Sequence, residues 1–411
     1  FDLKCTVSRA ELLKVLSVAE RALPKGAVIP LIENLHLEFT GSQLVAKATD
    51  TKIEVVSKMD FDTEKTLSVL LPPNFIPVLS ALDTPDVELE FNLDGDTGTV
   101  KLSGGKSVFT LYVRDVGEYP VIEERSPEGR SLSFTEKELK EQLKEAILCV
   151  STDESRPTFN CVVFRCTNKN VQVISSDTYR LSRRINQKVL GETQDFLVPA
   201  SSLKELIRLL GDADDAVDVF PADGRLVFKA KKFYFAAFLV RAKYPDISNV
   251  IPQQHTTQIV LKTKDLYDIV KRVSLIAAGA NRAVCLRTTG ESLEVYARSD
   301  LGRVMDTAVL ESKEGEDVRV YLNVGFLLDA LKAVSSGEVR MCFNGSLGSV
   351  VVHDGFSNDW LCLILPIKMD DPWEKEDEPA AEEEAGESAV AVDAEFGMKE
   401  EEEFDVPAVS E

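Results

Sequence analysis

The sequence predicts an α+β fold in which one structural unit occurs three times, each copy having two helices that back an antiparallel sheet. The first observation is an apolar run that ends in an aspartate and a turn, with spacings of 127 and 123 residues between Asp50, Asp177 and Asp300. The second is a short apolar run that leads into a helical pattern, with spacings of 127 and 124 residues between Leu71, Val198 and Leu322. The third is an apolar or aromatic residue followed by proline, with spacings of 125 and 121 residues between Tyr119, Tyr244 and Leu365. Because three landmarks share one period, and that period is a common domain size, we expect domains at 1–126, 127–252 and 253–369.

Each repeat is expected to begin with an amphipathic helix, over residues 8–23, 135–150 and 263–278, because apolar residues recur there at intervals of three and four. The expected buried stripes are Leu12, Leu13, Leu16, Ala19 and Leu23; Leu139, Leu143, Ala146, Ile147 and Val150; and Leu266, Ile269, Val270, Val273 and Ile276. A second helix in each repeat has the stripes Phe75, Val78, Leu79 and Leu82; Leu203, Leu206, Ile207 and Leu210; and Phe326, Leu327, Ala330 and Leu331.

The remaining apolar and alternating runs predict strands, and turn signals such as Gly-Gly, Asp-Gly and Asn-Gly separate them. The expected strands lie at 34–38, 44–48, 87–91, 108–113, 161–165, 171–174, 233–240, 293–297, 339–343 and 360–365. Each repeat is therefore expected to pack its two amphipathic helices against one antiparallel sheet.

The predicted helices carry bases on the side away from their apolar stripes. These are Lys14 and Arg21 in the first repeat, Lys137, Lys140, Lys144, Lys204 and Arg208 in the second, and Lys264, Lys271, Arg272 and Lys332 in the third. A solvated surface explains any one of these faces taken alone. Their recurrence in all three repeats of a protein with negative net charge favours contact with a polyanion.

The composition argues against several classes of function. The seven cysteines lack paired CxxC spacing and the three histidines lie in different repeats, so we expect no metal centre and no cofactor. The nucleotide-binding and nucleophile-elbow motifs are missing, and the three landmark aspartates are interpreted as turn residues, so we expect no enzyme. The first residues show no charged leader, and no apolar run reaches about 18 residues, so a soluble, cytoplasmic and nucleoid-associated protein is expected.

The acidic charge is concentrated at one end of the chain. Residues 370–411 contain 18 acidic residues and two lysines, a net charge of −16, which leaves −6 of the total −22 for residues 1–369. This Glu- and Ala-rich composition predicts a disordered tail.

Several segments in this order resemble the bacterial DNA polymerase sliding clamps, the beta subunit of DNA polymerase III. The resemblance runs from residue 3 to residue 369, and its specific pieces are 29–35 (IPLIENL), 176–181 (SDTYRL), 244–246 (YPD), 250–252 (VIP), 281–284 (NRAV), 322–331 (LNVGFLLDAL) and 365–369 (LPIKM). The resemblance implies three clamp domains per chain and a head-to-tail homodimer that closes into a ring, with helices inside and sheets outside. Duplex DNA would thread the ring without being read by sequence.

The resemblance also implies the site residues. Edge strands would pair across the dimer seam, where Lys106 and Phe109 of one chain face Leu275 and Ile276 of the other; ordinary core packing is the alternative for the three apolar residues. The bases expected to contact DNA phosphates are Lys14, Arg21, Lys25, Lys140, Lys144, Arg156, Lys204, Arg208, Lys271 and Arg272. A pocket for short peptides of the polymerase, the clamp loader and repair or translesion factors would involve Phe159, Ser176, Thr178, Tyr179, Arg180, Leu181, Pro245, Val250, Asn323, Phe326, Leu347, Ser349, Leu363, Pro366, Ile367 and Met369.

The sequence departs from the family pattern at a few positions. Thr178 and Tyr179 stand where glycine and histidine are common, Asn249 where arginine is common, and Phe326 where tyrosine is frequent. The tail follows Met369, where the family generally stops, and it is interpreted either as a solvated extension or as a regulator of access. As a regulator, its negative charge would repel DNA from the outer face, or Glu403-Phe404-Asp405-Val406 would visit the pocket as a weak internal competitor. The function implied is a replicative sliding clamp, with a specialised, noncatalytic clamp paralogue outside replication as the alternative.

Overall fold

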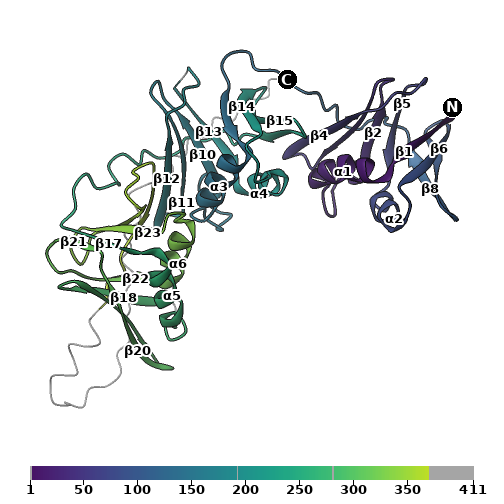
Figure 1. Cartoon of the computed structure of the whole chain (residues 1–411). Helices are drawn as coiled ribbons and strands as arrows, with labels where there is room; N and C mark the ends of the chain where they lie inside the picture. Colours follow the sequence, from purple (N-terminus) through teal and green to yellow (C-terminus); the bar gives the residue numbers. More distant parts are fainter. Residues whose placement is uncertain (1, 192, 280–281, 370–411) are drawn as a thin grey trace. The chain divides into compact units, whose positions relative to one another are not determined.

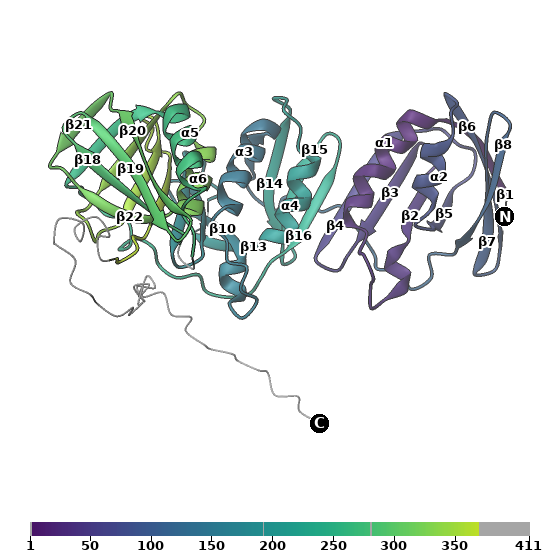
Figure 2. The same ribbon diagram turned by 90° about the horizontal axis from the view of Figure 1, so that it is seen from below.

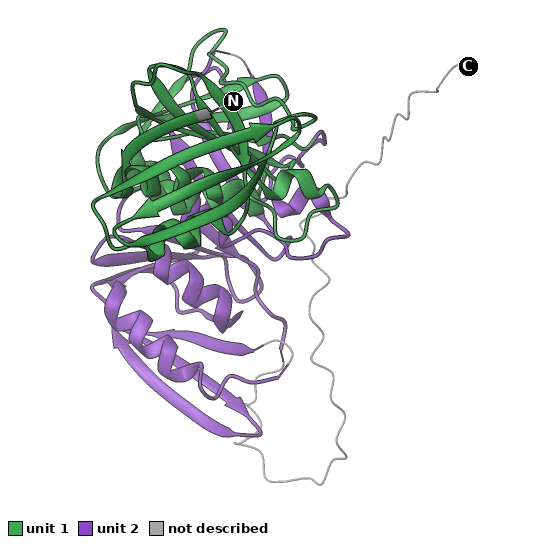
Figure 3. Cartoon of the chain, turned by 90° about the vertical axis from the view of Figure 1, so that its right-hand side faces the viewer, with its two compact units in different colours: residues 1–141, 198–240 green, residues 142–197, 241–411 purple. Residues whose placement is uncertain are grey.

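The computed structural model describes residues 2–191, 193–279 and 282–369. The chain forms two compact units, Phe1–Glu141 with Val198–Val240, and Gln142–Leu197 with Arg241–Glu411 (Figure 3). The acidic tail 370–411 and Asn281 of the NRAV segment lie outside the described residues.

The first unit contains one antiparallel sheet whose strand order is β1-β6-β7-β8-β5-β2-β3-β4-β16-β15-β14-β9 (Figure 1). Its strands are β1 (Asp2–Ser8), β2 (Leu35–Phe39), β3 (Gln43–Thr49), β4 (Ile53–Asp60), β5 (Leu67–Leu71), β6 (Asp86–Asp94), β7 (Thr97–Gly104), β8 (Ser107–Arg114), β9 (Leu132–Thr135), β14 (Ala216–Ala222), β15 (Arg225–Ala230) and β16 (Tyr234–Phe238). Helices α1 (Arg9–Ala19) and α2 (Phe75–Ala81) lie side by side on one face of this sheet (Figure 2), and α4 (Ala200–Leu209) packs near β16. Short 3₁₀ helices cover Glu20–Ala22 and Pro30–Glu33.

The second unit contains two antiparallel sheets, ordered β13-β10-β11-β12-β25-β24-β23-β17-β21 and β20-β19-β18-β22. The strands are β10 (Cys161–Cys166), β11 (Val171–Ser176), β12 (Arg180–Asn186), β13 (Gln194–Pro199), β17 (Thr257–Lys262), β18 (Ala283–Thr289), β19 (Ser292–Ser299), β20 (Gly302–Val309), β21 (Ser312–Gly315), β22 (Arg319–Asn323), β23 (Glu338–Phe343), β24 (Val350–Asp354) and β25 (Trp360–Ile364). The helices are α3 (Glu136–Ile147), whose second half belongs here, α5 (Thr263–Val273) and α6 (Val324–Ala333), with a 3₁₀ helix at Pro157–Asn160.

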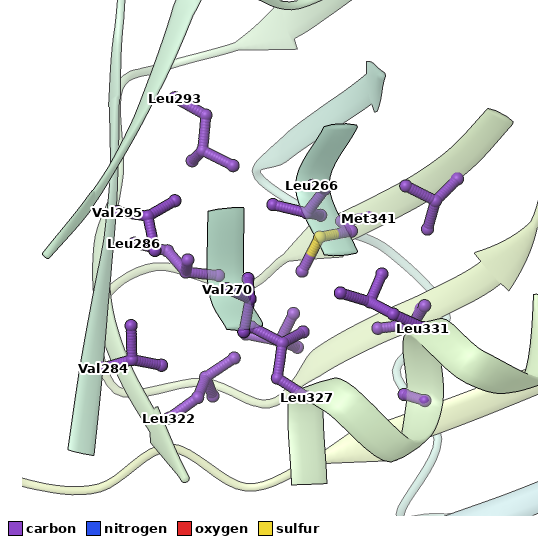
Figure 4. Close-up of a cluster of buried hydrophobic side chains, with 14 of the residues drawn as sticks. Leu266, Val270, Val284, Leu286, Leu293, Val295, Leu322, Leu327, Leu331 and Met341 are labelled. Atoms are coloured by element: carbon purple, nitrogen blue, oxygen red, sulfur yellow. The ribbon is translucent and has the colours of Figure 1, made fainter. Parts of the chain in front are cut away.

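A hydrophobic core of the second unit lies between its helices and strands. Leu266 and Val270 of α5 and Leu327 and Leu331 of α6 point toward side chains of β18, β19, β22 and β23 (Figure 4). Burial of such side chains contributes about 1.5–3 kcal/mol each, so the apolar stripes of the helices hold this unit together.

The predicted helices are confirmed, with shorter ends in the structure. Helix α1 ends at Ala19, α3 at Ile147 and α5 at Val273, so the expected ends at 23, 150 and 278 were too late. Val15 is buried although it was not in the predicted stripe. Members of the predicted stripes that are only partly buried are Leu13, Leu23, Val78, Ile147, Val150, Ile207, Ile276 and Phe326.

The predicted strands are present, but the sheets extend further than one repeat. Strand β4 pairs with β16, and Tyr234 lies opposite Val56. Strand β12 pairs with β25 in the same antiparallel sense, and Ser182 lies opposite Cys362. In both cases the strand that follows a landmark aspartate pairs with the last strand of the next repeat. The sequence did not predict β4 and β12, because their partners lie about 180 residues away.

A buried histidine makes the first unit sensitive to acid. Burial, and next the charge of Lys47, lower the pKa of His36 to about 4. Its Nε2 lies 2.6 Å from Ser68 Oγ, and its ring meets that of Tyr119 edge to face.

We expect the free energy of unfolding to fall between about pH 6.5 and pH 4 by up to roughly 1.4 kcal/mol per pH unit through His36. The sign follows because the unfolded histidine binds a proton in this range while the folded one stays neutral, so its stabilisation is complete only at higher pH. Chemical denaturation across this range should show that the free energy of unfolding depends less steeply on pH in His36→Gln than in the parent. The carboxylates are the same in both proteins, so they do not account for the difference. An equal slope in the two proteins would contradict the assignment.

Candidate functional sites

Two of the landmark aspartates hold turns, as predicted. Asp50 Oδ1 accepts hydrogen bonds from the backbone N–H groups of Lys52 and Ile53, both at 2.8 Å. Asp177 Oδ1 accepts the equivalent bonds from Tyr179 and Arg180 at 3.0 and 2.9 Å. The Asx turn satisfies the backbone between two strands and places β4 and β12 at the edge that the next repeat joins.

The residue after each of these two aspartates has a left-handed backbone. Thr51 has a φ of 74° and Thr178 a φ of 76°, a conformation that costs a β-branched residue about 1–2 kcal/mol.

Because Thr51 is exposed, Thr51→Gly removes this strain without leaving a cavity, and we expect a net gain of about 0.5–1 kcal/mol after the larger entropy loss of glycine. Urea denaturation measures the change. Thr51→Ala, which keeps a Cβ at this position, should give no such gain; a gain of the same size in both variants would show that strain is not its source.

The ten predicted phosphate-contacting bases lie on helices or in the loops after them. Lys14 is on α1, Arg21 and Lys25 follow it, and Lys144, Lys204 and Lys271 lie on α3, α4 and α5; all six are exposed. The other four also have protein partners: Lys140 with Asp212, Arg208 with Glu205, Arg272 with Asp306, and Arg156 with Thr178 Oγ1. The positive charge of these faces is therefore partly compensated within the protein.

Part of the predicted peptide pocket gathers around Arg180, at the joint between β12 and β25. The guanidinium bonds Asp177 at 3.0 Å and Asp329 at 2.9 Å, and its central carbon lies 4.2 Å from the centre of the Phe326 ring. Tyr179, beside it, is half exposed, and its carbonyl accepts the N–H of Leu365. Arg180 thus connects β12 to α6 beneath a surface that a peptide can reach.

A second part of the predicted pocket lies on the four-stranded sheet. Ile367 and Met369 pack against Tyr296 and Tyr321, and the N–H of Ile367 donates to the carbonyl of Tyr321. These two residues and the exposed Leu347 line a cavity of about 540 Å³. Other residues that line the cavity, among them Arg287, Arg319 and Tyr321, were not predictable from the sequence, because they lie in strands whose polar residues alternate without a distinctive motif.

Five of the predicted pocket residues are buried in this structure: Phe159, Ser176, Thr178, Leu181 and Leu363. They support the surface from below. Of the remaining members, Tyr179 and Leu347 are exposed and the others are partly buried; Asn323 caps α6 by accepting the N–H groups of Gly325 and Phe326, and the carbonyl of Pro245 accepts Arg165 Nη2.

The predicted seam residues lie at strand edges and on a helix end. Strand β8 pairs along its whole length with β7, whereas its other edge, among the described residues, pairs with β5 only at Arg114. Phe109 is 38% exposed and Tyr112 83% exposed on this strand, and Lys106 in the preceding turn is exposed. Leu275, just after α5, is 75% exposed, whereas Ile276 is partly buried.

Strand β20 forms a second open edge, at the end of the four-stranded sheet. It carries the exposed side chains of Met305 and Val309, and Leu301 precedes it. An edge strand with exposed apolar side chains is a template for pairing with another chain. Strand β20 was not among the strands predicted from the sequence.

The described residues contain no group of three or more His, Cys, Asp or Glu side chains arranged to hold a metal ion. None of the helices described is long and apolar enough to cross a membrane.

Three consecutive segments of the chain match models of one protein family. Residues 3–123 match the N-terminal domain of the DNA polymerase III beta subunit, residues 133–246 its central domain and residues 248–368 its C-terminal domain. The chain belongs to the DNA polymerase III beta subunit family, the bacterial beta sliding clamps. The predicted resemblance and the α+β fold of three clamp domains are thereby confirmed.

Individual beta sliding clamps are similar along most of the chain. The beta sliding clamp of Bacillus subtilis (strain 168) is 26% identical over 380 residues, which cover 89% of this chain and all of the relative. That of Staphylococcus epidermidis is 25% identical over 375 residues, covering 88% of this chain and 98% of the relative. The crystal structure of the DNA polymerase sliding clamp from B. subtilis superposes with a TM-score of 0.83 at 24% identity and covers 90% of this chain and all of that one. A DNA polymerase III beta subunit from Thermotoga maritima gives a TM-score of 0.80 at 24% identity over 90% of this chain and all of that one.

Proposed function

We propose that this chain is a noncatalytic DNA sliding clamp that closes as a homodimer around duplex DNA and holds the replicative DNA polymerase on its template. The observation that carries the proposal is the order of strands at the joints between repeats. Strand β4 pairs with β16, and strand β12 pairs with β25. In each case the strand after a landmark aspartate pairs with the last strand of the next repeat. In the third repeat the strand after the landmark is β20, and in the first repeat the last strand is β8.

Strand β20 follows a landmark and strand β8 is the last strand of its repeat, so these two strands are of the two kinds that pair at the other joints. Both offer a free backbone edge and exposed apolar side chains. Pairing of β20 from one copy with β8 of a second copy repeats the same joint, and two such contacts close a ring with twofold symmetry. Lys106, Phe109, Leu275 and Ile276 are proposed to lie at this seam.

The ten bases are proposed to face the DNA. They lie on helices and in the loops after them, while the sheets carry the joints between repeats. Phosphate contacts from lysine and arginine do not read sequence, and their partial pairing with Asp212, Glu205 and Asp306 keeps the affinity modest, which sliding requires.

The surface around Arg180, Phe326, Leu347 and Met369 is proposed to bind short peptides of the polymerase, the clamp loader and repair or translesion factors. It combines an exposed tyrosine and leucine with a cavity and buried apolar support, the arrangement that captures an extended peptide through a few anchors. The three domains are proposed to span 1–126, 127–252 and 253–369.

Primer extension by the host replicative polymerase on a long single-stranded circular template, with the clamp loader and ATP, tests this function. We expect products of full length with the chain present and short products without it. A specialised paralogue, the alternative function, would be loaded on the same template but leave product length unchanged.

A further inference from the structure

The nine-stranded sheet carries two arginines, with a histidine between them, in one row on the face away from its helices. Met341, Val352 and Cys362 point into the helix-covered core, so their neighbours along the strands point to the opposite face. In that outer face Arg183 of β12 lies opposite Leu361 of β25, Leu361 opposite His353 of β24, and His353 opposite Arg340 of β23. With strands about 4.8 Å apart, the row spans roughly 14 Å. We name this row, whose charge is carried by Arg183 and Arg340 and which has His353 between them, the outer cation row.

The positive charge of this row is not compensated by a carboxylate among the described residues. Arg183 Nε is buried without a hydrogen-bond partner, and burial lowers the pKa of Arg183. The guanidinium of Arg340 donates to the carbonyls of Gly355 and Ser357 and to Asn358 Oδ1, all neutral acceptors. Burial comes first in lowering the pKa of His353 to about 4, and the positive charges of Arg340 and Arg183 act with it, so that this ring is neutral above that pH. A partly buried guanidinium without a counter-ion is costly, and a carboxylate forms the strongest bonds with it.

Apolar side chains lie on both sides of the row. Two residues along the strands, Leu181 lies opposite Leu363 and Leu363 opposite Val351 on the same face, and all three side chains are buried. On the other side, Phe356 is 71% exposed in the turn whose carbonyls receive Arg340. A ligand that fits this surface carries carboxylates next to an aromatic or aliphatic group.

The chain itself contains a segment of this chemistry. Residues 400–406 read EEEEFDV, with one phenylalanine between acidic side chains, in a tail of net charge −16. The segment begins 31 residues after Met369. A flexible linker of that length has a root-mean-square reach of about 30 Å and a maximum near 100 Å, which covers the dimensions of a domain. DNA fits the row less well, because the proposed DNA-contacting bases of α5 belong to the opposite, helix-covered side of the fold.

We propose that the acidic segment 400–406 binds the outer cation row, with carboxylates on Arg183 and Arg340 and Phe404 against Phe356. Tethering raises the effective concentration of the segment to about the millimolar range, so a weak contact suffices. The contact itself is independent of clamp function. Only its consequence, competition with partner peptides for the neighbouring surface around Tyr179, rests on the proposed peptide pocket.

Photo-crosslinking in the full-length chain tests the contact. A benzophenone amino acid in place of Phe404 is irradiated and the crosslinked peptides are identified by mass spectrometry. We expect crosslinks to the strands and turns of the row, within 181–186, 338–343 and 351–361. Arg183→Glu should lower their yield roughly tenfold, as expected for the loss of one charge-assisted contact, and high salt should do the same.

Lys262→Glu is the matched control, since it reverses one exposed charge of the same unit at the end of β17 and should leave the yield unchanged. Because Arg183 Nε is buried without a hydrogen-bond partner among the described residues, Arg183→Gln should melt at or above the temperature of the parent, which shows that the fold is kept. Crosslinks confined to other surfaces, or a yield that Arg183→Glu does not change, would overturn the proposal. So would a result in which Arg183→Glu weakens retention on DNA and leaves the crosslinks as they were.

Discussion

Phe109→Asp is expected to convert the homodimer into a monomer at micromolar concentration. The substitution places a charge on the open edge of β8, where the proposed partner strand would bury it without a counter-ion. Loss of a central aromatic anchor and burial of a carboxylate together cost at least about 3–4 kcal/mol, a rise in dissociation constant of several hundredfold. Sedimentation equilibrium over a dilution series measures it.

Val121→Asp, an equally drastic change at an exposed apolar residue outside the proposed seam, is the matched control. It should leave the dimer intact. If Phe109→Asp and Val121→Asp sediment alike, the edge of β8 is not the seam.

Glu54→Gln is expected to lower the free energy of unfolding of the first unit by about 3–5 kcal/mol. Glu54, on β4, is almost fully buried and binds Arg125 at 3.0 Å and Arg225 at 2.9 Å. The change leaves two guanidinium groups, each less than one-fifth exposed, without their shared counter-ion; Asp223 then remains as a partner of Arg125.

This network lies at the joint where β4 pairs with β16, since Ala236 stands opposite Glu54. Thermal and chemical denaturation measure the loss. Glu38→Gln removes a more exposed pair with Lys47 on a neighbouring strand and should cost less than about 1 kcal/mol. Equal losses of unfolding free energy in the two variants would show that the buried Glu54 network stabilises the fold no more than the exposed Glu38–Lys47 pair does.

Local patterns were sufficient to predict the repeated unit. The apolar stripes of α1, α3 and α5 place buried residues at intervals set by the helix period, and Asp50 and Asp177 make the turns that their residue type favours. The joints were not predictable in this way. Pairing of Val56 with Tyr234 depends on residues far apart in the chain, and nothing local in either strand encodes the partner.

Parts of the candidate sites were beyond sequence reasoning for the same reason. The family resemblance supplied Phe326 and Arg180 but not their stacking, and it did not distinguish exposed Leu347 from buried Leu363. Arg183 and Arg340 became a site only when the register of four strands placed them in one row.

Retention on circular DNA tests the central claim, encirclement, most directly. The chain is loaded onto a nicked circular duplex with the clamp loader, separated from free protein by gel filtration, and followed after the circle is cut once. A closed ring predicts stable retention on the circle, even at a salt concentration that removes phosphate contacts, and loss within minutes of linearisation. Retention that persists on the linear molecule would contradict encirclement and point to ordinary lateral binding.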